Sequence, residues 1–529
     1  MSCCHLTRRQ LLRWSAIASG ATLLPGLDRG SAAAAGTALP INLELVTLTE
    51  TSAIVTWYTA VPGTADRSLQ MSPQPTTDNV VSFGTSPLTM TRTAHGAAGT
   101  AYHYVELTGL EPGQTYVYMA SSDGVPAAPA LFAVGNPAGS SVTGAGAAAL
   151  FGFTTPQPPK GEHLLTLVLC NDLHLGETVA GLITSQAGQQ IPPGFTTPEG
   201  EPPYAETMAG ALVVDARARG GDLLLAAGDV TSEASPADAT RAKQILDGFG
   251  THGSDYLVAR GNHDRPHTGS DCTAAKEADG THDCFRDSFF PGSGTGPTWS
   301  SQDVHGLHVV RLDTYDKAGN GGDNGILGPE QYAWFAADLA AHADQPTIVF
   351  GHHPITVEST LVNASPVRFD LDPQQAMMVE QLYAGAPGVF FHHAGHTHRN
   401  KRTVGTTARG VTFQEIGAVK EYPGGFSLLR LHTGGYAMNF YKTRADLARE
   451  WSERTRQEDF TVGPFYTFGT VADRNYVVDH DLSGLHTPSP ALPESVLAAA
   501  LPTAGLAAAG AAIALHRRRG DQGGAAGTP

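Results

Sequence analysis

The feature that most constrains the fold of this chain is a series of short apolar runs, each of which ends in polar residues. Between about residues 162 and 480 these runs alternate with segments of helical pattern, and such alternation predicts a layered α/β domain. The runs that we predict to be buried strands are 164–170, 223–227, 256–259, 307–312, 347–350 and 389–391. The predicted helices are 205–219, 236–249, 329–342 and 373–383.

Five polar clusters directly follow five of the apolar runs. In chain order they are Asp172-Leu173-His174, Gly228-Asp229, Gly261-Asn262-His263-Asp264, Gly351-His352-His353-Pro354 and Gly395-His396-Thr397-His398. Because the strands of α/β sheets present side chains to a crevice at their carboxyl ends, we expect the clusters to lie together. Carboxylate, imidazole and amide oxygen are ligand types that suit Mn, Fe and Zn. The pattern therefore predicts a metal site built from strand ends.

The clusters, in this order, resemble the motifs of the calcineurin-like metallophosphoesterases, and the resemblance covers most of residues 162–420. It implies a central β-sandwich flanked by helices, with two divalent metal ions at its edge. The implied ligands of the first metal are Asp172, His174 and His398. Those of the second are Asn262, His352 and His396, and Asp229 would bridge both. The tract Val349-Phe350-Gly351 favours His352 as the ligand from the fourth cluster, with His353 as the alternative.

The predicted chemistry follows from this arrangement. A bridging carboxylate holds two cations about 3.5–4 Å apart, and a water between them loses its proton near neutral pH. We therefore expect hydrolysis of a small phosphate mono- or diester by attack of a metal-bridging hydroxide. His263 is the predicted proton donor to the leaving oxygen, and Asp264 is predicted to orient it. The expected cofactors are two divalent ions, drawn from Mn, Fe and Zn.

Two other functions remain open at this point. One is a cyclic-nucleotide or nucleotide-sugar phosphodiesterase, which would use the same site. The other is a cell-surface binding module whose metal site is only structural. Structural sites usually have filled coordination and no spare acid–base group. The presence of His263 and Asp264 next to Asn262 therefore favours catalysis.

Residues 38–156 have the pattern of an all-β domain. Short alternating runs rich in Val, Thr and Tyr are separated by turn-forming Pro and Gly, which predicts a β-sandwich. The stretch 107–118 resembles the late strands of fibronectin type III domains, and such a domain precedes the catalytic domain in purple acid phosphatases. In those enzymes a tyrosine three residues after the bridging aspartate binds ferric iron, and this bond gives the purple colour. This chain has Ser232 there, so we expect no purple colour.

Both ends of the chain resemble targeting segments. Residues 1–36 contain Arg8-Arg9, an apolar stretch and an alanine-rich end, and they resemble a twin-arginine signal peptide. After a linker at 481–494, residues 495–519 form an uncharged stretch that ends in arginines, which predicts an apolar anchor with a basic stop. Residues 501–505 also resemble a sortase site, although Ala504 stands where that signal has threonine. We expect export and attachment to the membrane or cell wall at the extracellular face.

Charge and cysteine content narrow the expected partners. The formal net charge is −17, which is a poor match for long nucleic acid because such binding rewards clustered Lys and Arg. Cys272 and Cys284 flank a polar stretch and could close a short disulfide loop in an exported protein. Cys170 lies in an apolar run and is expected to be a buried thiol.

Overall fold

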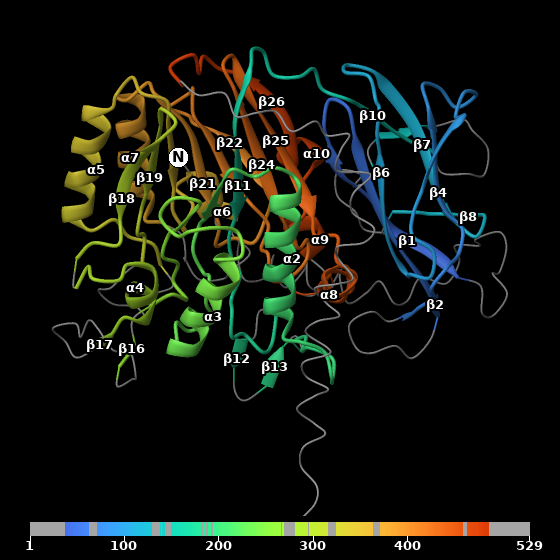
Figure 1. Ribbon diagram of the computed structural model, residues 1–529, viewed down its shortest axis with the longest axis horizontal. Helices are drawn as coiled ribbons and strands as arrows, with labels where there is room; N and C mark the ends of the chain where they lie inside the picture. The colour runs from blue at the N-terminus through green and yellow to red at the C-terminus, as the bar shows by residue number, and fades with distance from the viewer. Residues whose placement is uncertain are drawn as a thin grey trace, which may run out of the picture.

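The structure is a computed structural model in which two parts of the chain lie side by side (Figure 1). The residues that it describes are 38–62, 71–129, 138, 140–142, 150–181, 184–186, 189–191, 194–265, 267–268, 281–294, 296–315, 324–362, 371–456, 458 and 463–485. The predicted signal peptide at 1–36, most of the linker and the anchor at 495–519 lie outside these ranges. None of the helices in the described part of the chain has the length and apolar character needed to cross a bilayer.

The N-terminal part is a β-sandwich, as predicted. One sheet contains β1 (Leu39–Leu48), β2 (Ala53–Pro62), β3 (Met71–Pro73) and β6 (Tyr102–Leu107). The other contains β4 (Asn79–Gly84), β5 (Arg92–His95), β7 (Thr115–Ser122), β8 (Val125–Pro126), β9 (Ser140–Val142) and β10 (Leu150–Thr154). Buried and partly exposed residues alternate along β6, because successive side chains of a strand point to opposite faces. Trp57 and Tyr118 lie in the core between the sheets.

The second part contains two six-stranded sheets. The first has the order β15 (Tyr256–Val258), β14 (Leu223–Ala226), β11 (His163–Cys170), β24 (Gly425–His432), β25 (Gly435–Lys442) and β26 (Asn475–Asp479). The second has the order β18 (Ser300–Val304), β19 (Leu307–Arg311), β20 (Thr347–Phe350), β21 (Val389–Ala394), β23 (Thr412–Glu415) and β22 (Lys401–Val404). All six predicted strands are therefore present, and β11, β14 and β15 run parallel.

Helices lie outside these two sheets. The four predicted ones are α2 (Tyr204–Ala218), α3 (Pro236–Leu246), α5 (Pro329–Ala341) and α7 (Pro373–Ala384). Two of them begin at a side-chain cap, because Ser235 and Asp372 accept hydrogen bonds from the first-turn backbone. The shorter helices are α4 (Cys284–Phe289), α6 (Val357–Val362), α8 (Asp446–Thr455), α9 (Gly463–Tyr466) and α10 (Val471–Arg474). The short strand pairs are β12 (Thr184–Gln186) with β13 (Gln189–Ile191) and β16 (His267–Thr268) with β17 (Thr281–His282).

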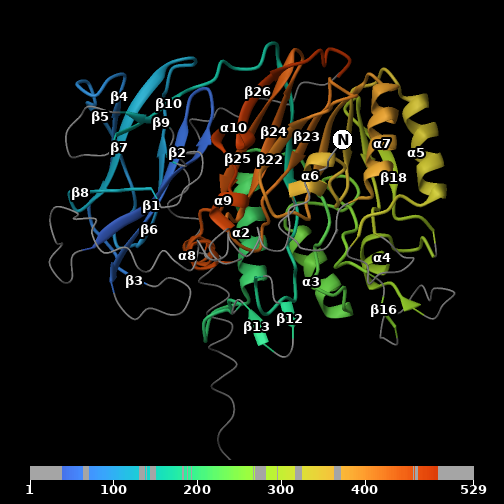
Figure 2. The same ribbon diagram turned by 180° about the vertical axis from the view of Figure 1, so that it is seen from behind.

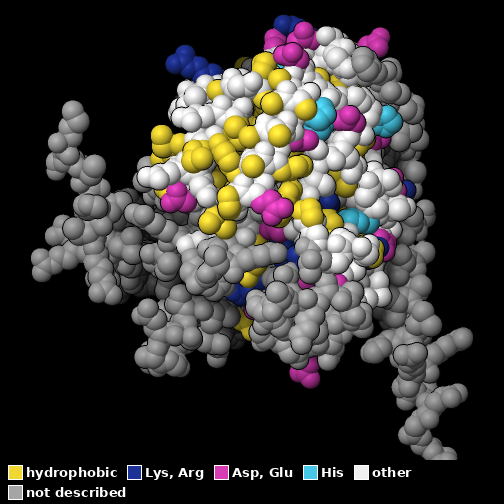
Figure 3. Space-filling model, turned by 90° about the vertical axis from the view of Figure 1, so that its left-hand side faces the viewer, with side chains coloured by type: hydrophobic (Ala, Val, Ile, Leu, Met, Phe, Trp, Pro, Cys, Tyr) yellow, Lys and Arg dark blue, Asp and Glu magenta, His cyan; other side chains and the backbone are white. Residues whose placement is uncertain are grey.

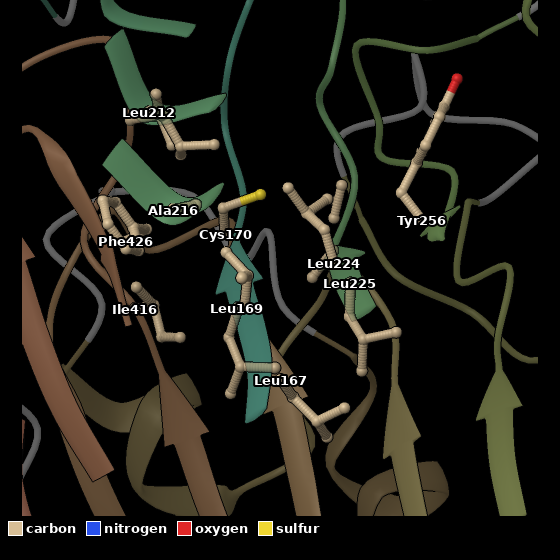
Figure 4. Close-up of a cluster of buried hydrophobic side chains, with 14 of the residues drawn as sticks. Leu167, Leu169, Cys170, Leu212, Ala216, Leu224, Leu225, Tyr256, Ile416 and Phe426 are labelled. Atoms are coloured by element: carbon tan, nitrogen blue, oxygen red, sulfur yellow. The ribbon is translucent and has the colours of Figure 1, made fainter. Parts of the chain in front are cut away.

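The main core lies around β11 and β14, whose side chains are buried on both faces (Figure 4). Continuous apolar runs suit parallel strands that are covered on both sides. Leu212 and Ala216 of α2 pack over the end of β11. Cys170, at that end, is a fully buried free thiol, as predicted. This packing fixes the strand ends that carry the polar clusters.

One half of the predicted disulfide can be checked. Cys284 is disulfide-bonded, whereas Cys272, its predicted partner, lies outside the described residues. Hydrophobic side chains gather on the face that α5 and α7 form (Figure 3). Met377 and Met378 of α7 are exposed. Both helices nevertheless bury their inner sides, through Phe335 and Val379, against the second sheet.

Strand β1 joins the two parts of the molecule (Figure 2). The side chain of Asn475 accepts a hydrogen bond from the backbone N–H of Leu48 at 3.0 Å, and Asn439 donates to the Leu48 carbonyl at 2.8 Å. The carboxylate of Glu50 forms two 2.7 Å contacts with the guanidinium of Arg430 on β24. The interface is therefore held by specific polar contacts as well as by packing.

Candidate metal centre

The five polar clusters meet at one edge of the two sheets. Three follow β11, β14 and β15 of the first sheet, and two follow β20 and β21 of the second. Hydrogen bonds tie the loops together: the backbone N–H of Asp172 donates to Gly228, and that of His174 donates to Asp229. The structure thus brings together the seven side chains that the sequence predicts as metal ligands.

The backbone at this edge is unusual. Asp172, His174, Asp229, His396 and His398 all have positive φ, between 48° and 69°. L-residues other than glycine seldom adopt this left-handed conformation, and where they do it often marks a functional site. The left-handed conformation therefore falls on five of the seven predicted ligands.

The first group of ligand atoms contains Asp172, His174 and His398. Oδ1 of Asp172 lies 3.2 Å from Nε2 of His398 and 3.7 Å from Nε2 of His174. The other oxygen of Asp172, Oδ2, accepts hydrogen bonds from Asn171 and from the backbone of His396. One carboxylate oxygen is therefore held by donors, and the other faces the imidazoles. His398 is 24% exposed, so the group opens to solvent on its side.

The second group contains Asn262, His352 and His396. Oδ1 of Asn262 lies 2.9 Å from Nε2 of His352 and 3.1 Å from Nδ1 of His396. These two imidazole nitrogens are 3.2 Å apart. The three atoms form a compact triangle of one oxygen and two nitrogens.

Asp229 belongs to both groups. Its Oδ2 lies 3.0 Å from Nε2 of His352 and 3.6 Å from Nε2 of His174. Its Oδ1 accepts the backbone N–H of His263 at 2.8 Å. The side chain is 3% exposed, so this carboxylate is shared between the groups and shielded from solvent.

The residues fit a pair of divalent cations. Ligand atoms that share one cation at about 2.1 Å lie roughly 3–3.5 Å from one another, close to the separations seen in both groups. Oδ1 of Asp172 and Nε2 of His174 are buried and have no hydrogen-bond partner among the described residues. Buried polar atoms normally have a partner, and a cation would supply one here. The donor set of carboxylate, imidazole and amide oxygen is also the one that transition metals take.

The carboxylates of this site favour the protonated form of two of its imidazoles. Burial opposes the charged form of His352, but the Asp229 carboxylate outweighs it and raises the pKa of His352 to about 9. In the same way Glu177 overcomes burial and raises the pKa of His174 to about 9. Burial would raise the pKa of Asp172, yet the imidazole of His398 holds it well below its usual range. Cations would replace these protons, because metal binding requires neutral imidazole.

Two carboxylates that sequence reasoning missed lie behind the first group. Oε2 of Glu177 is 2.7 Å from Nδ1 of His174, and Oε1 of Glu421 is 2.5 Å from Nδ1 of His398. The ammonium of Lys420 lies between them, 2.7 Å from Glu177 and 2.8 Å from Glu421. Carboxylates in this place orient a ligating imidazole and leave its Nε2 for the metal. The three-residue spacing from His174 to Glu177 was the one available signal, whereas nothing pointed to 420 and 421.

His263 lies near the first group, but its predicted partner is wrong. Its ring centroid is 4.5 Å from that of His174, and its Nδ1 is 2.8 Å from the carbonyl oxygen of Ser232. A carbonyl can only accept, so Nδ1 carries the proton and Nε2 is the atom that can exchange one. Asp264 does not contact this ring. It is fully buried and accepts hydrogen bonds from the backbone of Val230, Thr231 and Gly261 and from the Thr231 hydroxyl, so it fixes the loop that carries Asp229.

The alternative ligand His353 faces another neighbour. Its Nδ1 is 2.7 Å from the Thr314 hydroxyl, although its ring is close enough to His352 and His396 to form a third candidate ligand group. The direct contact of His352 with Asp229 favours His352 as the ligand from the fourth cluster.

A separate group is formed by His308, Asp338 and His342. The rings of His308 and His342 are stacked 3.9 Å apart, and both nitrogens of His308 already face carboxylates. Parallel rings cannot point both lone pairs at one ion, so we assign this group to ion pairing.

Comparisons with known proteins agree with this geometry. The model of the calcineurin-like phosphoesterases matches residues 165–400, and the model of the purple acid phosphatase N-terminal domain matches residues 39–132. No curated protein matches the chain significantly.

Two solved structures show the level of structural similarity. A purple acid phosphatase from yellow lupin (Lupinus luteus) seeds is 13% identical, with a TM-score of 0.37, over 86% of this chain and 78% of its own. A dimetal phosphatase from Danio rerio is 13% identical, with a TM-score of 0.38, over 54% of this chain and 98% of its own. Similarity at this level carries no weight for the chemistry, which depends on the family models and on the residues of the site.

Proposed function

Because this chain is a metal-dependent phosphoesterase with a calcineurin-like phosphoesterase domain and a purple acid phosphatase N-terminal domain, we propose that it hydrolyses small phosphate esters outside the cytoplasm with two divalent ions. The observation that carries the proposal is the position of Asp229 Oδ2 between Nε2 of His174 and Nε2 of His352. One carboxylate oxygen shared by two ligand groups suits a bridged pair of cations.

The proposed ligands divide between the two cations. Asp172, His174 and His398 would hold the first, and Asn262, His352 and His396 would hold the second, with Asp229 between them. Divalent ions bound there would activate water and neutralise charge on the phosphoryl oxygens. Mn, Fe and Zn all suit this mixed oxygen and nitrogen set.

The chain itself supplies the proton for the leaving group. In the proposed reaction, water gives up a proton to solvent, its oxygen bonds to phosphorus and the ester P–O bond breaks. The imidazolium form of His263 keeps its Nδ1 proton in the hydrogen bond to Ser232 and donates its Nε2 proton to the leaving oxygen, and the ring then regains that proton from solvent. The Ser232 carbonyl holds Nδ1, which fixes the ring and the tautomer. His263 is more exposed than the buried Asp229, so it lies at the solvent side of the group. A site for structural metal alone would not need such a group.

Export is supported by two independent features. Residues 1–36 carry the paired arginines and apolar stretch of a twin-arginine signal. Cys284 is disulfide-bonded, and disulfides persist mainly in oxidising compartments. We propose that the enzyme acts at the extracellular face and that residues 495–519 attach it to the membrane or cell wall.

The class of ester that the enzyme cleaves is tested with chromogenic and natural substrates. The full chain, loaded with Mn²⁺, would be assayed with p-nitrophenyl phosphate and bis-p-nitrophenyl phosphate, and with nucleotide sugars and cyclic nucleotides as natural diesters. Cleavage of the diesters would favour a phosphodiesterase, and cleavage of the monoester alone would favour a phosphatase. Failure to hydrolyse any of them with both metals bound would contradict the proposal and favour a binding module.

A further inference from the structure

The N-terminal β-sandwich places one buried carboxylate at the interface with the catalytic domain. Glu44 of β1 is 1% exposed. Its Oε1 accepts from the Tyr422 hydroxyl and from the guanidinium of Arg456, both at 2.6 Å, and its Oε2 accepts from the Lys442 ammonium at 2.7 Å. A buried charge is costly unless it is paired and hydrogen-bonded, and here each oxygen has at least one donor. All three donors belong to the catalytic part of the chain.

One of these donors belongs to the loop that lies behind the metal centre. Tyr422 follows Lys420 and Glu421 directly, in the segment 416–424 between β23 and β24. On one side of this loop, the backbone N–H of Lys420 donates to the Asp172 carbonyl at 3.2 Å. On the other side, the carbonyl of Lys420 accepts from Trp451 of α8 at 2.7 Å. The loop is thus held between the metal ligands and the interface with the β-sandwich.

The contacts form a continuous path from the β-sandwich to two candidate ligands. Glu44 holds the Tyr422 side chain, and Tyr422 is adjacent in the chain to Glu421, which contacts His398. Through Lys420, the same loop also reaches the carboxylate of Glu177 behind His174. Each of these contacts is 2.7 Å or shorter. A shift of Tyr422 would therefore move the groups that orient both imidazoles.

We infer that the β-sandwich is a positioning element of the metal centre, in which Glu44 fixes Tyr422 and, through the 416–424 loop, the orientation of His174 and His398. The inference rests on the proposed metal centre and extends it. It assigns the N-terminal part a share in metal binding, beyond its role as a domain that packs against the catalytic one. Residues behind metal ligands commonly change metal affinity about 10–100-fold when they are replaced.

A second interdomain contact supplies a matched control. Glu50 pairs with Arg430 through two 2.7 Å contacts, so it joins the same two parts of the molecule. Arg430 lies on β24, outside the 416–424 loop. Replacing Glu50 removes an interdomain ion pair without touching the path from Glu44 to Glu421.

The test measures Mn²⁺ binding by the full chain rather than activity. Metal-free wild type, Glu44→Gln, Tyr422→Phe, Glu50→Gln and the Glu44→Gln/Tyr422→Phe double variant would be titrated with Mn²⁺. Bound metal would be counted after equilibrium dialysis, and circular dichroism would confirm that each variant is folded. We expect Glu44→Gln and Tyr422→Phe each to raise the Mn²⁺ dissociation constant about 10-fold. The double variant should lose less Mn²⁺-binding free energy than the two single variants lose together, because both residues act through one contact. Glu50→Gln should bind as wild type does.

Two results would overturn the inference while leaving the proposed function intact. One is unchanged Mn²⁺ affinity in folded Tyr422→Phe, which removes only the hydroxyl and is informative even if Glu44→Gln does not fold. The other is an equal loss of Mn²⁺ affinity in Glu50→Gln, which would show that Glu44 acts only by holding the two domains together. A wild-type chain that binds no pair of Mn²⁺ ions would overturn the proposed metal centre, and this inference with it.

Discussion

Oδ2 of Asp229 lies 3.0 Å from Nε2 of His352, although Asp229 follows a strand of the first sheet and His352 follows a strand of the second. The site therefore depends on how the two sheets pack, and it cannot form on either sheet alone. The shared core beneath it contains residues of both sheets, among them Leu225 and Phe350. Changes that move one sheet against the other should affect metal binding before they affect secondary structure.

Replacing the proposed proton donor should slow catalysis without removing metal. For His263→Asn we expect kcat to fall about 10²–10⁴-fold, the usual effect of losing a general acid. Because His263 is not a proposed ligand, two metals per chain should remain bound, as measured by elemental analysis. A substrate with a good leaving group, such as a nitrophenyl ester, should suffer less than an alkyl phosphate. Unchanged turnover of the alkyl phosphate would remove His263 from the mechanism.

Asp264 should give a different phenotype from its neighbour. Its two oxygens accept three backbone N–H bonds and the Thr231 hydroxyl, so Asp264→Asn replaces one accepting oxygen with an NH2 donor and disrupts the loop that carries Asp229. Burial and the nearby Asp229 carboxylate raise the pKa of Asp264 above its usual range. We expect Asp264→Asn to lower the number of metals retained on dialysis. If it retained both metals and slowed hydrolysis of the alkyl phosphate more than that of the nitrophenyl ester, as expected for His263→Asn, Asp264 would act through His263 after all.

The two carboxylates behind the histidines should change metal affinity. Glu421→Gln keeps the shape of the side chain but leaves His398 Nδ1 with a neutral partner and Lys420 with one carboxylate fewer. We expect its Mn²⁺ dissociation constant to rise about 10–100-fold. Glu206→Gln, which breaks only a surface contact with Arg241, is a suitable control and should bind as wild type does. Equal affinity in Glu421→Gln and the control would show that this carboxylate does not support the ligand.

Glu44 should make the stability of the protein depend on acid pH. Burial would raise its pKa, but Arg456 and Lys442 outweigh burial and lower the pKa of Glu44 to about 2, from 4.5. A lowered folded-state pKa contributes stability that is fully present above the unfolded value and is lost as the pH falls toward 2. The advantage of wild type over Glu44→Gln in free energy of unfolding should therefore shrink by roughly 3 kcal/mol between pH 6 and pH 2. Urea denaturation at several pH values would measure it, and a constant difference would contradict the assignment.

The architecture was predictable from sequence because its strands are apolar runs that end in motifs. The runs at 164–170 and 389–391 correspond to β11 and β21, and the polar clusters that follow them lie together as expected. Some strands that no such motif follows were not predicted, among them β24 and β25, which pair along their whole length and contain Arg430 and Asn439. Buried polar residues at the interface with the N-terminal part disrupt the apolar pattern there.

Side-chain partners were harder to predict than the positions of ligands. Asp264 is adjacent in sequence to His263, yet the turn points the two side chains in different directions, and Ser232 takes the expected place. Glu421 lies 23 residues from His398, and no local spacing connects them. Its position is set by tertiary packing of the 416–424 loop, which a single sequence does not display.

The bridged metal pair is tested most directly by counting bound metal ions and measuring the rate of hydrolysis, in wild type and in Asp229→Asn. We expect two metals per wild-type chain together with phosphoester hydrolysis. Asp229→Asn should lose at least one metal and nearly all turnover, because the shared oxygen no longer carries a negative charge. An Asp229→Asn variant that hydrolyses the ester at the wild-type rate, or a wild-type chain fully active with a single metal, would contradict the claim that two bridged cations form this site.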